Sequence, residues 1–309
     1  MKNKKFNSVV KIGGGLLAGV LTPGIVHACA CGCGVFEVGS QSMVGHGAGA
    51  TAFVEYDAMD QDHNWSGGSG APAVDNPDRR LRTGFATVGL QYLLPNGWGA
   101  LLEAPWAHRS FLTAGDDGLV ASTHDALGDL RVQAVFAGFA ADMATGVSAG
   151  LRLATGDASF PAFDRDAEIG SGSTDALLGA WHTGVLAGGG RWQWFADARG
   201  DLPFATRGGY RPGDELDASA AVVRAGQRLG GLRLSPRLGL VGSLRAHDGG
   251  AAADPPNSSY ARLLLAPGLE LRAAAVALDL SVALPLAQRV SGDQLVAPAL
   301  VKLHLSRRF

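Results

Sequence analysis

The sequence predicts an all-β protein, a transmembrane antiparallel β-barrel of the outer-membrane type with about 12 strands. Three observations support this class. Apolar and polar residues alternate over long segments. Short and long connections between these segments also alternate. Finally, no apolar run long enough for a membrane helix follows residue 28, and the mean hydropathy is only +0.12, as expected when only every second residue of a strand meets lipid.

The alternation is clearest in the last third of the chain. In residues 276–286, VALDLSVALPL, the leucines and valines share one parity, whereas Asp279 and Ser281 take the other. A period of two indicates a strand with one apolar face. Strands of soluble sheets usually have about five or six residues, and about 9–11 are needed to cross a bilayer. The length therefore favours a membrane strand.

Segments of this kind are spread over the whole chain after residue 48. They begin near residues 49, 80, 97, 124, 143, 173, 190, 214, 232, 258, 274 and 295. Short turns are expected at 95–97, 141–143, 188–190, 230–231 and near 273, and longer polar links at 58–79, 109–123, 156–171, 204–213, 246–257 and 287–294. Tight periplasmic turns and longer outer loops are typical of outer-membrane barrels. An even strand number places both termini on the periplasmic side. A soluble secreted β-sandwich is the alternative, with shorter strands.

The N-terminal residues indicate export. Residues 1–28 begin with Lys2, Lys4 and Lys5, continue with an apolar stretch and end in VHA, which predicts a signal peptide cleaved after Ala28. A retained anchor helix is the alternative. The predicted organisation is a signal peptide (1–28), a cysteine-rich periplasmic segment or plug (29–48) and the barrel (49–309), in the outer membrane of a Gram-negative cell.

All three cysteines lie in the segment CACGC, at Cys29, Cys31 and Cys33. Three thiolates at alternating positions suit a soft metal such as Cu(I) or Zn(II). Attachment to a partner by a disulfide, lipidation of Cys29, or no role are the other interpretations. The metal interpretation leads to an alternative function, a barrel-anchored, periplasm-facing metal-binding or redox-partner protein.

Charged residues collect on the parity that faces the barrel interior. A polar lumen is what a channel requires. The candidates are Glu103, Arg131, Arg152, Asp197, Arg199, Arg233, Arg237, Arg262, Glu270 and Asp279. Two interpretations are open: Arg233, Arg237 and Arg262 form a basic ladder that favours anions, or arginines and carboxylates pair across the lumen and brace the wall.

The sequence indicates no enzyme and no nucleic-acid binding. The zinc motif HExxH is absent, and no catalytic residue is assigned. The formal net charge is −2, and no basic patch is evident.

Several stretches resemble the outer-membrane family labelled "MetA-pathway of phenol degradation". They are ALGDLRV (126–132), LATGD (153–157), IGSGSTDALLG (169–179), YRPGDELDASAAV (210–222), APGLEL (266–271) and the segment 285–309. The resemblance implies an outer-membrane channel or uptake protein, with a hydrophobic or aromatic small solute. The partners expected for the protein are outer-membrane lipid, the barrel-assembly machinery and that solute.

The glycine-aspartate motifs within these stretches also have a physical interpretation. Glycine permits backbone angles that other residues resist, and aspartate accepts hydrogen bonds from nearby backbone amides. Gly156, Asp157, Gly170, Gly172 and Asp175 are therefore expected at strand-to-loop corners that flank an outer loop.

Overall fold

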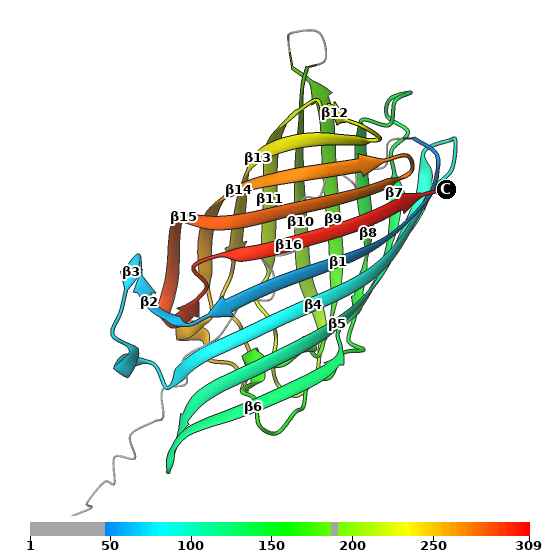
Figure 1. Ribbon diagram of the computed structural model, residues 1–309. Helices are drawn as coiled ribbons and strands as arrows, with labels where there is room; N and C mark the ends of the chain where they lie inside the picture. Colours follow the sequence, from blue (N-terminus) through cyan, green and yellow to red (C-terminus); the bar gives the residue numbers. More distant parts are fainter. Residues whose placement is uncertain (1–46, 187–190) are drawn as a thin grey trace, which may run out of the picture.

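The protein is a closed antiparallel barrel of 12 strands, seen in a computed structural model that describes residues 47–186 and 191–309 (Figure 1). This confirms the predicted fold class. The barrel strands are β1 (Gly49–Gln61), β4 (Asp78–Leu93), β5 (Trp98–Gly115), β7 (Leu130–Phe136), β8 (Thr145–Leu153), β9 (Ser173–Val185), β10 (Trp192–Thr206), β11 (Glu215–Arg224), β13 (Leu232–Arg245), β14 (Tyr260–Ala273), β15 (Val276–Val296) and β16 (Leu300–Arg308).

The first and last strands close the barrel. Val54 of β1 is the register partner of Val88 on β4 and of Leu305 on β16, and both pairings are antiparallel. Each remaining barrel strand pairs with its neighbours in chain order. Closure leaves no unpaired strand edge in the wall, which is the condition that lipid imposes on a β-structure.

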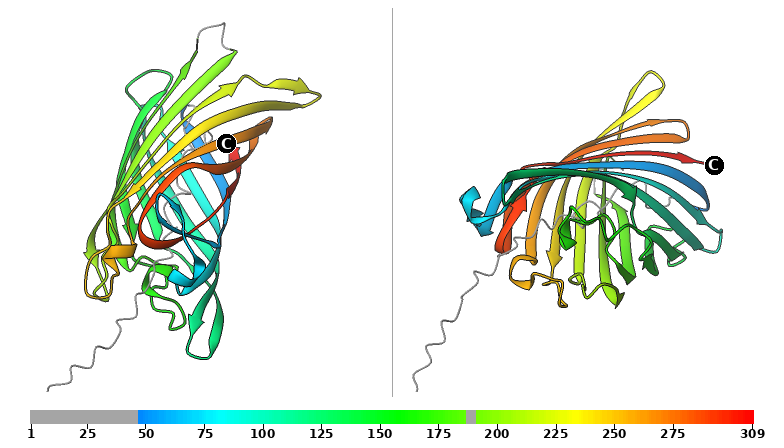
Figure 2. Two further views of the ribbon diagram at one scale, coloured as in Figure 1. Left: turned by 90° about the vertical axis from the view of Figure 1, so that its left-hand side faces the viewer. Right: turned by 90° about the horizontal axis from the view of Figure 1, so that it is seen from below.

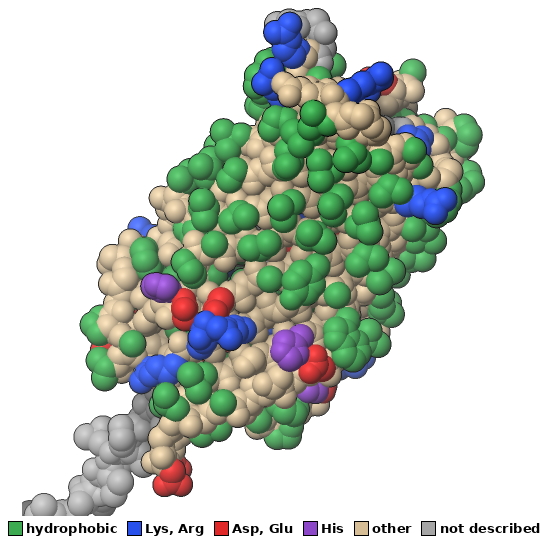
Figure 3. Space-filling model, in the orientation of Figure 1, with side chains coloured by type: hydrophobic (Ala, Val, Ile, Leu, Met, Phe, Trp, Pro, Cys, Tyr) green, Lys and Arg blue, Asp and Glu red, His purple; other side chains and the backbone are tan. Residues whose placement is uncertain are grey.

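Alternate residues face the two sides of the wall. On β1, Phe53 and Glu55 are 4% and 8% exposed, whereas Val54 and Tyr56 are 47% and 48% exposed. The outer wall is accordingly covered with apolar side chains over most of its height (Figure 3). Its exposure in the isolated chain is explained if lipid covers it, because a soluble monomer rarely shows so large an apolar surface.

The two ends of the barrel differ. At the terminal end, where Phe309 lies, β4 and β5 are joined by residues 94–97, and β14 and β15 by residues 274–275. At the loop end, at the lower left of Figure 1, most connections are longer, as between β8 and β9 (154–172) and between β13 and β14 (246–259). The expected alternation of short and long connections is therefore present.

Several predicted boundaries differ from the structure, two of them near residue 124 and at residues 287–294. The strand expected near residue 124 is divided into β6 (Gly118–Leu127) and β7, because the chain turns at Gly128 and Asp129 and the Gly128 amide donates to the carbonyl of Pro105. The link expected at 287–294 is instead the second half of β15, which leaves the barrel wall and pairs with β2 (His63–Gly67).

Short strands and 3₁₀ helices lie at both ends of the barrel. They are β3 (Ser69–Gly70), β12 (Gln227–Leu229) and the 3₁₀ helices η1 (Ala73–Asp75), η2 (Arg165–Ala167) and η3 (Pro255–Asn257). None of the helices within the described residues is long and apolar enough to cross a membrane.

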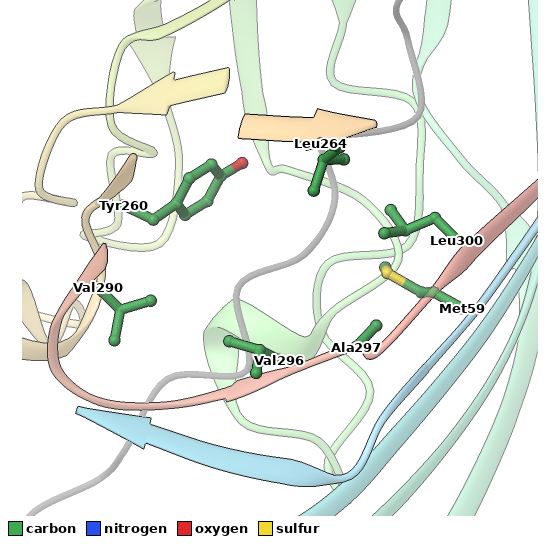
Figure 4. Packing of buried hydrophobic residues seen from close by; sticks show 7 residues of the cluster. All are labelled: Met59, Tyr260, Leu264, Val290, Val296, Ala297 and Leu300. Carbon is green, nitrogen blue, oxygen red and sulfur yellow. The ribbon is translucent and has the colours of Figure 1, made fainter. Parts of the chain in front are cut away.

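An apolar cluster lies inside the barrel at the loop end. The end of β15 curves across this mouth, so that Val296 and Ala297 approach Met59 of β1 and Leu300 of β16 (Figure 4). Leu264 of β14 belongs to the same cluster and is 1% exposed. Figure 2 shows from two further sides how the end of β15 curves across the opening of the barrel. This part of the mouth is filled by side chains.

Candidate functional site

The lumen holds a cavity of about 100 Å³. It lies between the barrel wall and residues 154–172, which we call the constriction loop. Its lining is unusually rich in charge for a protein interior, where ionised groups are costly unless they are paired. The charged lining residues are Glu55, Asp57, Glu103, Asp129, Arg131, Arg152, Arg165, Asp166, Glu168, Arg199, Glu215 and Arg245.

Ion pairs join neighbouring strands on one side of this cavity. Arg152 of β8 contacts Asp175 of β9 and, at 2.8 Å, Asp201 of β10. Arg245 of β13 lies 3.8 Å from the carboxylate of Glu215 on β11, and it also contacts Asp248 in the following connection at 2.8 Å. These pairs tie adjacent strands together, because each partner satisfies a charge that would otherwise be buried alone.

A second group of charges lies on β1 and β16. The Lys302 ammonium is 2.9 Å from the carboxylate of Glu55 and 3.6 Å from that of Asp57. His304 Nδ1 is 3.1 Å from the other Glu55 oxygen, and its ring stacks on Phe53 with centroids 5.0 Å apart. On the inner face of the barrel, the pairing of β1 with β16 is thus reinforced by the Lys302 ammonium, which lies between the carboxylates of Glu55 and Asp57.

Glu103 of β5 is held less tightly. It is 6% exposed, and the hydrogen bond that it accepts from the Gln133 amide is long, at 3.5 Å. Arg199 of β10 interacts with it electrostatically across the lumen. Glu103 and Arg199 therefore place charges of opposite sign on facing sides of the cavity.

The constriction loop folds into the barrel and is anchored by Arg109 of β5. This arginine is 0% exposed and donates to the carbonyls of Ala167 and Glu168 at 2.6 and 2.7 Å, and to Thr83 Oγ1 at 3.1 Å. Hydrogen bonds from a charged donor are stronger than neutral ones. η2 is thereby held against the inner wall.

The two ends of the constriction loop meet at a narrow neck. A Cβ atom on Gly170 would lie 2.4 Å from the carbonyl carbon of Gly156, so both positions require glycine. The Asp129 carboxylate accepts from the amides of Gly156 and Ser171, each at 2.8 Å. The Gly170 amide donates to the carbonyl of Asp157 at 2.6 Å. The neck is thus fixed by backbone contacts and one carboxylate.

Aromatic rings hold the tip of the loop against the wall. Phe163 meets Phe111 of β5 edge-on at 5.8 Å, and Phe160 stacks on His124 of β6 at 4.1 Å. Arg165 lies over the Tyr210 ring at 4.2 Å. Aromatic pairs of this geometry add roughly 0.5–1.5 kcal/mol each beyond area burial.

Three ionisable groups in the connections at the loop end respond to this environment. Burial raises the pKa of Glu168 to about 7. Burial also raises the pKa of Tyr210 well above its usual range. Although partial burial opposes it, the hydrogen bond from His124, with those from Ser159, holds the pKa of Asp157 below its ordinary value.

Toward the terminal end, one side of the inner wall is apolar. Phe53, Leu93, Leu101 and Val135 form a buried cluster, against which Trp181 packs. The charged cavity therefore lies between an apolar layer at the terminal end and the apolar packing of the constriction loop. Apolar, charged and apolar surfaces therefore follow one another along this side of the lumen.

The sequence-predicted lumen residues are distributed along the barrel. Glu103, Arg131, Arg152 and Arg199 line the charged cavity. Nearer the terminal end, Arg237 pairs with Asp279 at 2.6 Å and Arg272 with Glu270 at 3.1 Å. Asp197 accepts a hydrogen bond from Ser219, Arg262 lies over Tyr260 at 4.0 Å, and Arg233 is exposed at the terminal end.

The structure does not bring the three ladder arginines together. Arg237 is opposite Gly268 of β14, whereas Arg262 is opposite Ser243 and Arg233 is opposite Arg272. The three residues are therefore spread along the height of the wall. Arg237 instead forms a buried pair, which is the bracing arrangement.

The corner motif belongs to the constriction loop. Gly156 and Gly170 form the neck, Gly172 has φ +64°, and Asp157 bonds His124 at 2.9 Å. Asp175 is the exception, because it lies within β9, faces the lumen and pairs with Arg152.

Sequence reasoning missed Arg109 and the inward fold of the loop. The link was expected to begin at residue 109, whereas β5 continues to Gly115. Continued alternation through Ala107, Arg109 and Phe111 was the available signal. Tyr210 stood out only as the first residue of the family-like stretch 210–222.

The predicted signal peptide and the cysteines Cys29, Cys31 and Cys33 lie outside the described residues. Within residues 47–186 and 191–309, no group of three or more His, Cys, Asp or Glu side chains is placed to hold a metal ion.

Comparison with known proteins bears on the fold. The COG4313 outer membrane channel from Pseudomonas putida F1 superposes with a TM-score of 0.63 at 16% identity, over 88% of this chain and 100% of that one. The β domain of the Bordetella autotransporter BrkA gives 0.51 at 12% identity, over 84% and 100%. No family model and no curated protein matches the chain. The fold is thus that of outer-membrane β-barrels, and the named family resemblance stays a prediction.

Proposed function

We propose that this protein is an outer-membrane channel for a small solute. The observation that carries the proposal is the charged cavity inside a closed barrel whose outer wall is apolar. A polar interior beside an apolar exterior is the arrangement of a channel that crosses lipid. The likeness to a solved outer-membrane channel supports the fold that this requires.

The proposed orientation places the terminal end in the periplasm and the loop end outside the cell. Short turns at the terminal end and long connections at the loop end support it, because outer-membrane barrels have short periplasmic turns. In this orientation the constriction loop controls entry from outside.

The proposed solute is a small molecule that joins an apolar or aromatic body to a charged group. Aromatic and apolar side chains line both ends of the route, at Phe160, Phe163, Phe53 and Trp181. The middle carries both signs of charge, with Glu103 facing Arg199. A pure hydrocarbon would gain nothing from these charges, and a bare ion would gain nothing from the rings. The family resemblance, which implies a hydrophobic or aromatic solute, agrees with the aromatic body.

Conductance in planar bilayers tests the channel. Refolded protein should give discrete current steps, and deletion of residues 158–168 should enlarge them because the constriction is removed. Heat-modifiable gel migration establishes that both forms contain the folded barrel. A correctly folded loop-deleted barrel that passes no current would refute the channel.

Solute preference is tested separately by swelling of liposomes that contain the protein. Benzoate, benzylammonium and benzyl alcohol have similar bodies but different charges. The charged pair should enter faster than the alcohol, and Arg199→Gln should reduce the rate for benzoate more than that for benzylammonium. Equal entry of all three solutes would contradict the proposed role of the charged cavity.

A further inference from the structure

Polar side chains form two rows on the outward face of the β5–β6 hairpin, directly beside an apolar row. In this apolar row, Trp106 of β5 pairs with Leu127 of β6, and both side chains are exposed. The next row pairs His108 with Asp125, and the one after it pairs Ser110 with Thr123. Tryptophan prefers the membrane–water interface. These two rows therefore lie at the depth of lipid headgroups and ester bonds.

His108 and Asp125 form a hydrogen-bonded pair on this surface. His108 Nδ1 is 2.7 Å from Asp125 Oδ1, and the two side chains are 59% and 49% exposed. A carboxylate only accepts, so Nδ1 carries the proton. Nε2 is then the basic nitrogen. An aspartate that orients an imidazole in this way is the second half of a hydrolytic triad.

Ser110 supplies a hydroxyl beside this pair. It is two residues from His108 on the same strand, so it shares the outward face and lies about 6.6 Å further along β5. Its register partner on β4 is Arg82. Arg82 Nε donates to Asp60 at 2.9 Å, and its side chain is 56% exposed. Its terminal guanidinium nitrogens can therefore face negative charge that develops near Ser110.

The wall is open on the other side of the imidazole. The register partner of His108 on β4 is Gly84, which has no side chain. A Cβ there would lie 2.8 Å from the Tyr56 hydroxyl, so this phenol leans over the gap. An acyl chain that runs along the apolar wall could place its ester above Gly84, with His108 on one side and Tyr56 on the other.

We propose that Ser110, His108 and Asp125 form an esterase site on the outer wall that hydrolyses carboxylic esters of membrane lipids. Ser110 Oγ attacks the carbonyl carbon while its proton passes to His108 Nε2. The ester C–O bond breaks, and this proton leaves with the alcohol. Water then attacks the acyl-serine, again through His108, and releases the carboxylic acid. The reaction requires no co-reactant besides water, and it is separate from transport through the lumen.

The other histidines near the wall provide controls. His182 of β9 also faces outward, but its Nδ1 is 2.6 Å from Thr145 Oγ1 and no carboxylate orients it. His124 follows Thr123 on β6, faces inward and is covered by Phe160. His182→Ala should therefore leave ester hydrolysis unchanged.

Hydrolysis of a short-chain phosphatidylcholine in detergent micelles tests the site, together with labelling by a fluorophosphonate and intact-mass measurement. The full chain should release fatty acid and gain one adduct on Ser110. Ser110→Ala and His108→Ala should lower the rate at least about 100-fold, and Asp125→Asn at least about tenfold. All variants should retain heat-modifiable migration and channel conductance, since these residues face away from the lumen.

The contrary results are equally definite. Hydrolysis that is the same in the wild type and in Ser110→Ala, with no adduct on either, would overturn the proposal. An adduct on Thr123 would overturn the assignment of Ser110 as nucleophile. Absence of conductance in both the wild type and Ser110→Ala, with Ser110 of the wild type labelled, would refute the channel and leave the esterase site standing.

Discussion

Replacement of Arg109 by methionine should release the constriction loop. Methionine keeps the packing volume beside Phe85, whose ring lies 5.6 Å from the guanidinium carbon, but it cannot donate to the carbonyls of Ala167 and Glu168. Each hydrogen bond from a charged donor contributes about 1.5–3 kcal/mol. The loss of two therefore weakens the packed loop by at least about 3 kcal/mol, which lowers the ratio of closed to open loop about 100-fold.

Two measurements follow this change in refolded protein. The open fraction or step size in planar bilayers should rise. Trypsin should cleave after Arg165 in the variant at much lower dose than in the wild type, because the loop leaves the lumen. Arg272→Met is the matched control, since Arg272 pairs with Glu270 at the other end of the lumen. Wild-type conductance together with wild-type resistance to trypsin in Arg109→Met would refute the argument that Arg109 holds the loop.

Three further predictions concern the loop and the N-terminal segment. Burial raises the pKa of Glu168 to about 7. The Glu168 carboxyl therefore ionises from about pH 4.5 upward when the loop is released, but it stays protonated until about pH 7 when the loop is packed. Packing of the loop should thus weaken, and conductance should rise, as the pH increases between these two values. Glu168→Gln should remove this pH dependence of the conductance. A pH dependence that persists in the variant would contradict the role of Glu168. Gly170→Ala should widen the neck and cost about 1–3 kcal/mol, measured as higher conductance and lower thermal stability, because its Cβ would contact Gly156. A soft metal at Cys29, Cys31 and Cys33 should disappear from purified protein in the triple Cys→Ser variant, as elemental analysis would show; equal metal content in both would exclude these ligands.

Much of the barrel was predictable because its rules are local. Alternation in segments such as residues 276–286 reports which side chains meet lipid, and turn residues such as Gly97 mark where the chain reverses. The inward parity of Glu103, Arg152 and Arg199 follows from the same period of two. None of these inferences depends on which strands are neighbours.

Pairing across the lumen could not be read from the chain. The parity of Arg237 and Asp279 is visible in the sequence, but their contact depends on the side chains reaching across β14, which lies between β13 and β15. The outer-wall pair of His108 and Asp125 likewise depends on the register of the β5–β6 hairpin. A shift of one residue would turn Asp125 to the inner face.

The sequence by itself determined the closed, lipid-facing wall, because alternation, strand length and turn spacing are properties of short segments. Only the tertiary structure decided what fills the lumen. The constriction loop reads in sequence as an ordinary polar link, and it folds inward because Arg109, Asp129 and the Gly156–Gly170 contact meet it there. Contacts between residues so far apart in the chain exist only after the barrel has closed, so no local pattern records them.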